Sequence, residues 1–110
     1  MPVILRRKHQ GKKRESARLS VDFPRQGEII SFPTYTLRLS APQDLKNVEV
    51  SIDGGAWRAC RQAEGFWWYD WSDYDDGEHS IVTRVELREG RMLASEPHQC
   101  FVDLQPKRVP

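Results

Sequence analysis

The acidic run between Asp70 and Glu78 could do chemistry, because hard cations such as Ca²⁺ bind clustered carboxylates. Five carboxylates fall within nine residues there: Asp70, Asp73, Asp75, Asp76 and Glu78. Their spacing does not match a calcium-binding EF-hand loop. When Gly77 is placed at the invariant glycine of that loop, Ser72 and Tyr74 fall where acidic ligands belong. We therefore interpret the run as a solvated loop between two strands and predict no metal site.

The two cysteines, Cys60 and Cys100, are the next candidates for chemistry. Neither has a histidine or a second cysteine at the spacing of a zinc site. The N-terminal segment contains Arg6-Arg7-Lys8, and no apolar segment follows these residues. Neither a secretory nor a twin-arginine signal therefore fits. No stretch approaches the roughly 20 apolar residues of a membrane span. We expect a cytoplasmic protein in which both thiols are free and Cys100 is partly buried.

The three histidines do not form a catalytic group. His9 lies in the basic N-terminal segment, and His79 and His98 lie on two expected strands. A catalytic histidine needs a nucleophile or carboxylate partner in a recognisable constellation, and the sequence offers none. It also contains no glycine-rich phosphate loop and no nucleophile elbow. The sequence predicts a protein that is not an enzyme, with no catalytic residues and no cofactor.

The remaining pattern is one of short β-strands in a single domain. Val48, Val50 and Ile52 alternate ahead of Asp53-Gly54-Gly55, which is a strong hairpin signal. Pro97 interrupts the last strand and favours a bulge or an edge there. Strands are expected at 19–23, 28–31, 35–40, 48–52, 57–61, 66–71, 79–87 and 92–104. Seven or eight strands without a helical period predict an all-β, antiparallel β-sandwich.

The order of several motifs resembles a family. These motifs are Pro24-x-x-Gly27, Tyr35-x-Leu37-x-Leu39-Ser40-Ala41, Val48-x-Val50-Ser51-Ile52-Asp53-Gly54, Trp67-x-Tyr69-x-Trp71, Asp76-Gly77-x-His79, and Arg84 followed by Gly90. Together they resemble bacterial immunoglobulin-like (Ig-like or fibronectin-III-like) domains. The Ser-x-Asp-Gly-Gly-x-Trp hairpin also resembles the dimerisation domain of sulfite-oxidase-type molybdenum enzymes. Such domains usually serve as spacers, docking modules or dimerisation units.

The resemblance implies a domain organisation, a role for one histidine and a cysteine arrangement. His79 matches a frequent family position at the start of a long strand, where it would pack against or bond a turn. Residues 1–17 would form a basic arm, 18–104 the Ig-like sandwich and 105–110 a C-terminal tail. In an Ig-like sheet two strands would separate Cys60 from Cys100, which exceeds the roughly 7 Å Cα separation that a disulfide can bridge.

The aromatic strand 66–71 offers the first candidate binding surface. If Trp67, Tyr69 and Trp71 face the core, as the resemblance implies, Phe66 and Trp68 face the other way. Large aromatics on a sheet face are unusual in a monomer and are typical anchors of protein interfaces. Stacking on a sugar ring is an alternative. A third possibility is that the arm, the tail or a loop covers both rings.

The basic arm offers the second candidate binding surface. Residues 1–18 carry a net charge of +6, whereas residues 19–110 carry −5. The arm's candidate partner-binding residues are Arg6, Arg7, Lys8, Lys12, Lys13 and Arg14. They could neutralise nucleic-acid phosphates, an anionic membrane surface or an acidic protein groove. A solvated tail is the usual fate of such a run.

These features favour a non-catalytic interaction or structural subunit that docks into a larger assembly. The contact would use the Phe66 and Trp68 face, or an edge strand at either 19–23 or 66–71, together with the arm. Self-association is a further possibility. The alternatives are a nucleic-acid-binding module acting through the arm and a carbohydrate-binding module acting through the aromatic rings.

Overall fold

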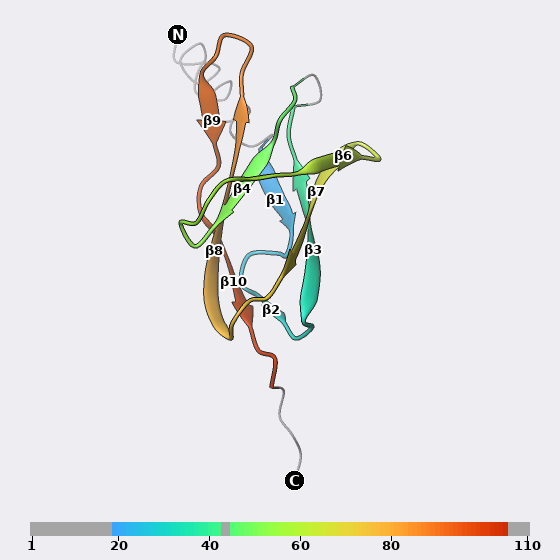
Figure 1. The fold of residues 1–110 in the computed structure, drawn as a ribbon, viewed down its shortest axis with the longest axis vertical. Helices are drawn as coiled ribbons and strands as arrows, with labels where there is room; N and C mark the ends of the chain where they lie inside the picture. Colours follow the sequence, from blue (N-terminus) through green and yellow to red (C-terminus); the bar gives the residue numbers. More distant parts are fainter. Residues whose placement is uncertain (1–18, 43–44, 106–110) are drawn as a thin grey trace, which may run out of the picture.

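The computed structural model describes residues 19–42 and 45–105, which form two packed β-sheets (Figure 1). The first sheet has the order β1 (Ser20–Phe23), β3 (Thr34–Ser40), β7 (Phe66–Ser72) and β6 (Arg61–Ala63). The second has the order β2 (Glu28–Ile30), β10 (His98–Val102), β8 (Gly77–Glu86), β4 (Glu49–Ile52) and β5 (Arg58–Ala59), and β9 (Met92–Ala94) pairs with β8. The predicted Ig-like sandwich is confirmed. Within the described ranges, no helix is long and apolar enough to span a membrane.

The strands are more finely divided than the sequence indicates. The return strand of the hairpin is split at Cys60, because β5 stays in the six-stranded sheet and β6 joins the four-stranded one. The last expected strand is split into β9 and β10 around Pro97, whose missing N–H prevents a continuous ladder. The pairing is also not wholly antiparallel, since β2 runs parallel to β10. The chain changes sheets between β1 and β2, which brings β2 alongside β10 in this direction.

The hairpin between β4 and β5 turns where the sequence predicts. Asp53 and Gly54 both have positive φ angles, of 55° and 74°. Glycine adopts this region without steric cost, and Asp is among the residues that tolerate it best. The Gly55 amide donates to the Ile52 carbonyl at 3.0 Å, which closes the turn. Local residue types therefore determine this connection.

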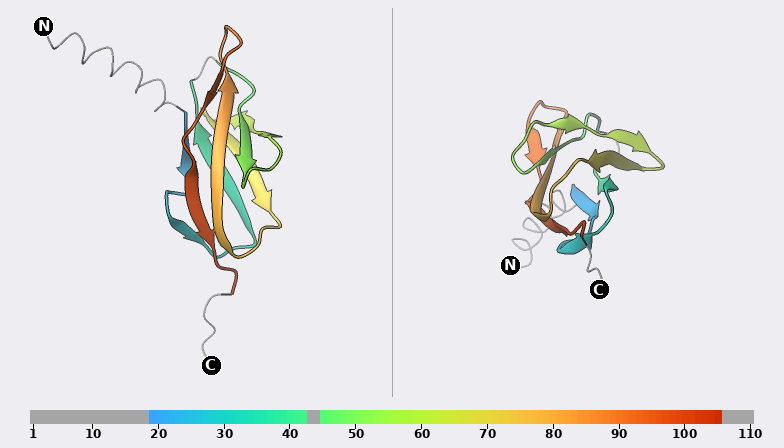
Figure 2. Two further views of the ribbon diagram at one scale, coloured as in Figure 1. Left: turned by 90° about the vertical axis from the view of Figure 1, so that its left-hand side faces the viewer. Right: turned by 60° about the horizontal axis from the view of Figure 1, so that its bottom comes forward.

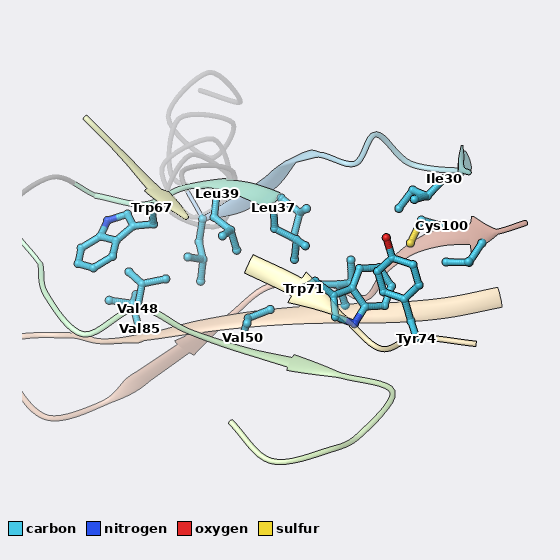
Figure 3. Packing of buried hydrophobic residues seen from close by; sticks show 14 of the residues in the cluster. Ile30, Leu37, Leu39, Val48, Val50, Trp67, Trp71, Tyr74, Val85 and Cys100 are labelled. Carbon is cyan, nitrogen blue, oxygen red and sulfur yellow. The ribbon is translucent and has the colours of Figure 1, made fainter. Parts of the chain in front are cut away.

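The core lies between the sheets and is built from the inward positions of alternating strands (Figure 3). Leu37 and Leu39 of β3 face Val50 of β4 and Ile81 and Val85 of β8, and all five are fully buried. Trp67 and Trp71 of β7, Val48 before β4, and Cys100 and Val102 of β10 complete the same cluster. Because side chains alternate along each strand, burying these residues turns their neighbours outward.

The edges of the sheets decide which strands can accept a partner strand. β1 and β6 are the outer strands of the four-stranded sheet, and β7 lies between β3 and β6. The expectation that 66–71 provides an edge is therefore wrong for residues 66–68, because they pair with residues 61–63 of β6. The other candidate, 19–23, does supply an edge, since β1 pairs only with β3 among the described strands.

Two adjacent residues of β2 test the inward and outward assignment. Ile30 is 2% exposed and Ile29 is 65% exposed. We expect Ile30→Ala to lower the free energy of unfolding by about 2–5 kcal/mol, as is typical of a buried Ile. The matched Ile29→Ala change removes the same atoms from an exposed site and should cost below about 1 kcal/mol. Urea unfolding of both variants measures the difference, and equal losses would contradict this placement of β2.

The hydroxyl of Thr83 gives a second stability prediction. It is buried on β8 and has no hydrogen-bond partner within the part of the chain that the structure describes. A buried polar group without a partner retains its desolvation cost. We expect the near-isosteric Thr83→Val to raise the free energy of unfolding by about 1 kcal/mol. Thr34→Val, at an exposed site on β3, serves as the control, and a loss of stability at position 83 would contradict the argument.

Candidate interaction face

The predicted alternation along β7 is present in the structure. Trp67 and Trp71 are 6% and 7% exposed and belong to the core, and Tyr69 packs against it partly buried. Phe66 and Trp68 lie on the opposite, outer face of the four-stranded sheet, where both are half-buried. Their rings contact each other edge-on, with centroids 6.2 Å apart.

An arginine from the neighbouring strand stacks on the Phe66 ring. Arg38 of β3 is paired in register with Trp68, so both side chains emerge on the same face. Its guanidinium carbon lies 4.1 Å from the ring centroid of Phe66 and 4.8 Å from that of Phe23 on β1. The guanidinium carbon of Arg25 lies 5.3 Å from the same Phe23 centroid. We call the set Arg25, Phe23, Arg38, Phe66 and Trp68 the arginine–aromatic row.

Polar contacts fix the row in place. Asp22 accepts a hydrogen bond from Arg38 Nε at 3.3 Å and one from the Ser40 hydroxyl at 2.5 Å. Trp68 Nε1 donates to the carbonyl oxygen of Ala63 on β6 at 2.9 Å. Guanidinium–ring contacts are worth about 0.5–1 kcal/mol at exposed sites and about 2 kcal/mol when desolvated. The row is therefore a pre-ordered surface in which these side chains have already lost much of their rotamer freedom.

A charged pair borders the row on β6 and β7. Arg61 donates to both carboxylate oxygens of Asp70, at 2.9 and 3.3 Å, and the Thr36 hydroxyl donates to the same group at 2.9 Å. The hydrogen bonds from Arg61 and Thr36 lower the pKa of Asp70 below its ordinary value. Asp70 thus belongs to a polar margin of this face.

The other sheet carries a similar but smaller stack on its own outer face. The guanidinium carbon of Arg84 on β8 lies 4.1 Å from the Trp57 ring, and its Nε donates to Glu49 of β4 at 2.9 Å. On each outer face an arginine thus stacks on aromatic rings: Arg38 on Phe23 and Phe66, and Arg84 on Trp57. A single stack of this kind is not in itself a binding site. The extended row on the four-stranded sheet differs in containing three rings and two guanidinium groups.

The remaining acidic residues are dispersed. Asp76 accepts the backbone N–H of Leu104 at 2.7 Å, and Asp75 contributes its carbonyl oxygen to a contact with His79. Within residues 19–42 and 45–105, no group of three His, Cys, Asp or Glu side chains is arranged to hold a metal ion. The run from Asp70 to Glu78 spans the end of β7, a loop and the start of β8, as the sequence predicts.

His79 connects two turns at one end of the sandwich. Nδ1 lies 2.6 Å from Asp53 Oδ2 on the β4–β5 turn, and Nε2 lies 2.7 Å from the Asp75 carbonyl oxygen on the β7–β8 loop. A carboxylate and a carbonyl can only accept, so both ring nitrogens can donate at once only when the ring is protonated. Trp71 packs edge-on against it, with centroids 5.2 Å apart. The expectation that His79 bonds a turn is confirmed.

A shallow depression of about 350 Å³ opens beside His79, lined in part by Arg58, Trp71 and Asp73. It is open and mainly polar in character, and the buried ring of Trp71 belongs to the core. These properties do not provide the enclosed apolar walls that small-molecule sites have.

The two cysteines are free, as predicted. β8 and β4 lie between β10, which carries Cys100, and β5, which precedes Cys60. Burial raises the pKa of Cys60 to about 12 and that of Cys100 to about 11. Both thiols are therefore protonated at neutral pH and lack the thiolate that nucleophilic chemistry needs. Cys100 is fully buried, more so than expected.

The predicted arm residues Arg6, Arg7, Lys8, Lys12, Lys13 and Arg14 lie outside the described residues. The sequence patterns did not identify Phe23, Arg25 and Arg38 as part of the face. The alternation around Leu37 and Leu39 indicates that Arg38 points outward, but nothing local indicates that β1 and β7 lie on either side of it.

Comparison with solved structures identifies the class of fold. The fibronectin(III)-like modules of Clostridium thermocellum CbhA match with a TM-score of 0.65 at 15% identity, over 78% of this chain and 96% of that one. An engineered protein matches with a TM-score of 0.62 at 17% identity, over 78% of this chain and 20% of its own length. No family model and no curated protein matches the sequence. The chain therefore has a fibronectin-III-like β-sandwich fold.

The His79 contact predicts a pH dependence of stability. Burial opposes the charged ring, but the hydrogen bonds to Asp53 and Asp75 outweigh it and raise the pKa of His79 above 6.5. A pKa raised on folding gives stabilisation that is complete below about pH 6.5 and is lost as the pH rises through the folded-state value. Urea unfolding between about pH 6 and pH 9 should show this decline.

Two variants isolate the effect. His79→Gln should flatten the decline, because the remaining side chain does not titrate. His98→Gln is the matched control, since the ring of His98 bonds the Pro24 carbonyl oxygen and has no carboxylate partner among the described residues. If His79→Gln kept the full decline, the assignment of the imidazolium would be contradicted.

Proposed function

We propose that this protein is a non-catalytic interaction module that docks onto a protein partner through the arginine–aromatic row. The observation that carries the proposal is Arg38, held between Phe23 and Phe66 on an outward sheet face. Aromatic residues and arginine are enriched among the residues that dominate binding energy at protein interfaces. Binding a partner over the row would have a small ordering cost, because the side chains are already positioned.

The open edge of β1 adds a second element to this surface. Phe23 belongs to both β1 and the row, so a strand that pairs with β1 would bring its side chains beside Phe23 and Asp22. Strand addition supplies affinity through main-chain hydrogen bonds, and the row would supply specificity. The arm residues at 6–8 and 12–14 would contribute long-range attraction to acidic surfaces.

Charge favours a protein over a nucleic acid as the partner. Residues 19–110 carry a net charge of −5, which repels phosphates, so nucleic-acid binding would rest on the arm alone. Removing residues 1–17 should then abolish such binding. Under the proposed function the same truncation should only weaken the association.

The test compares two half-buried tryptophans on the outer faces of opposite sheets. Tagged full-length protein is used in quantitative affinity purification from native lysate, as wild type, Trp68→Ala and Trp57→Ala. We expect Trp68→Ala to reduce recovery of a stoichiometric protein partner at least tenfold, which corresponds to about 1.4 kcal/mol. Trp57→Ala should leave recovery unchanged, because its indole stacks on Arg84 on the other face.

Stability measurements separate binding from folding. Trp68 is half-buried, so its removal should cost less than the about 3–5 kcal/mol typical of a core Trp. Loss of that full amount would assign Trp68 a structural role. Equal recovery with both variants would overturn the proposed face. Recovery of nucleic acid that is lost at high salt would instead support the alternative function of the arm.

A further inference from the structure

An apolar pair lies exposed on the outer face of the six-stranded sheet, away from the arginine–aromatic row. Ile29 on β2 and Phe101 on β10 are direct register partners, so their side chains lie side by side. They are 65% and 40% exposed, and Phe32, on the loop that follows β2, is 68% exposed. Figure 2 shows β2 and β10 together at one end of the sandwich. We call Ile29 and Phe101 the apolar pair.

Carboxylates surround the apolar pair. Glu78 on β8 is the register partner of Phe101 on its other side and is exposed. Asp103 lies two residues beyond Phe101 and is also exposed, and Asp76 is held at the same strand end by its bond to the Leu104 amide. The apolar pair therefore suits an occupant that combines apolar side chains with positive charge.

The chain itself contains such a segment. Val3-Ile4-Leu5 is followed directly by Arg6-Arg7-Lys8. We propose that residues 3–8 dock on the apolar pair of the same molecule, with the apolar side chains against Ile29 and Phe101 and the basic ones toward Glu78 and Asp103. The second basic run, Lys12-Lys13-Arg14, follows Gly11 and has no apolar residues directly before it. It therefore lacks the apolar side chains that would contact the apolar pair.

Chain length permits docking within one molecule. Ten residues separate Leu19 from Ile29, so at most about 36 Å can lie between them. The fourteen residues between Leu5 and Leu19 reach up to about 46–50 Å when extended. The straight-line distance to the apolar pair is therefore within reach of the extended segment.

Docking within one molecule is also favoured over exchange between copies. A segment tethered by a short flexible linker has an effective concentration in the millimolar range. A second copy at micromolar concentration competes poorly with it. A direct pairing of two apolar pairs is less favourable still, because Glu78 and Asp103 of both copies would approach each other.

The experiment uses the isotope-labelled full chain in the absence of any partner. The wild type is compared by ¹H–¹⁵N NMR with the triple charge reversal Arg6→Glu, Arg7→Glu and Lys8→Glu. The matched control is Lys12→Glu, Lys13→Glu and Arg14→Glu, which changes the charge by the same amount in the same arm. We expect the amide signals of Ile29, Phe101 and Glu78 to shift with the first variant and to stay near their wild-type positions with the control.

A third variant and a dilution series distinguish docking within one molecule from contact between copies and from non-specific attraction. Replacing Val3, Ile4 and Leu5 with Ser should cause the same shifts as the first charge reversal, because it removes the apolar half of the contact. The wild-type positions should not depend on protein concentration; dependence would indicate exchange between copies and overturn docking within one molecule. Equal shifts with both charge reversals would indicate non-specific attraction and overturn the proposal. The absence of any shift in the amide signals of the apolar pair would also overturn it. The outcome is independent of the test with Trp68, which needs a partner.

Discussion

The structure depends on burying one face of each sheet against the other. Fully buried Leu37 and Leu39 on one side meet Val50, Ile81 and Val85 on the other, and the two buried β7 tryptophans belong to the same cluster. Since side chains alternate along a strand, this single requirement also decides what faces outward. Arg38, Phe66 and Trp68 lie on the outer surface because Leu37, Leu39 and Trp67 lie inside. The candidate interaction face is thus the reverse side of the core.

On both outer faces, an arginine side chain covers half-buried aromatic rings. A large aromatic ring on a solvated sheet is costly to leave bare, and an arginine from another strand covers it while keeping its charge in water. Arg84 does this for Trp57, and Arg38 does it for two rings at once. The larger row is what distinguishes the four-stranded sheet. Its rings are accessible in part, and its geometry is set before any partner arrives.

Charge is separated along the chain, which links the two proposals. The sandwich is acidic and the N-terminal segment is basic. Acidic groups near the β7–β8 loop are used locally, by His79 and by the Leu104 amide, and others remain exposed beside the apolar pair. A docked N-terminal segment would occupy the six-stranded sheet and leave the arginine–aromatic row free for a partner.

Local patterns in the sequence determined the strands and the hairpin at Asp53-Gly54-Gly55, because each depends on neighbouring residues alone. The inward direction of Trp67 and Trp71 was implied by the family resemblance, since the strand is aromatic on both faces. Only the tertiary structure decided which strands are neighbours. The pairing of β6 with β7 removed an expected edge, and the placement of β3 between β1 and β7 put Arg38 between two rings. The parallel pairing of β2 with β10 set Ile29 beside Phe101, although the two lie near opposite ends of the sequence. Such contacts follow from strand register across the whole domain, and no local propensity encodes register.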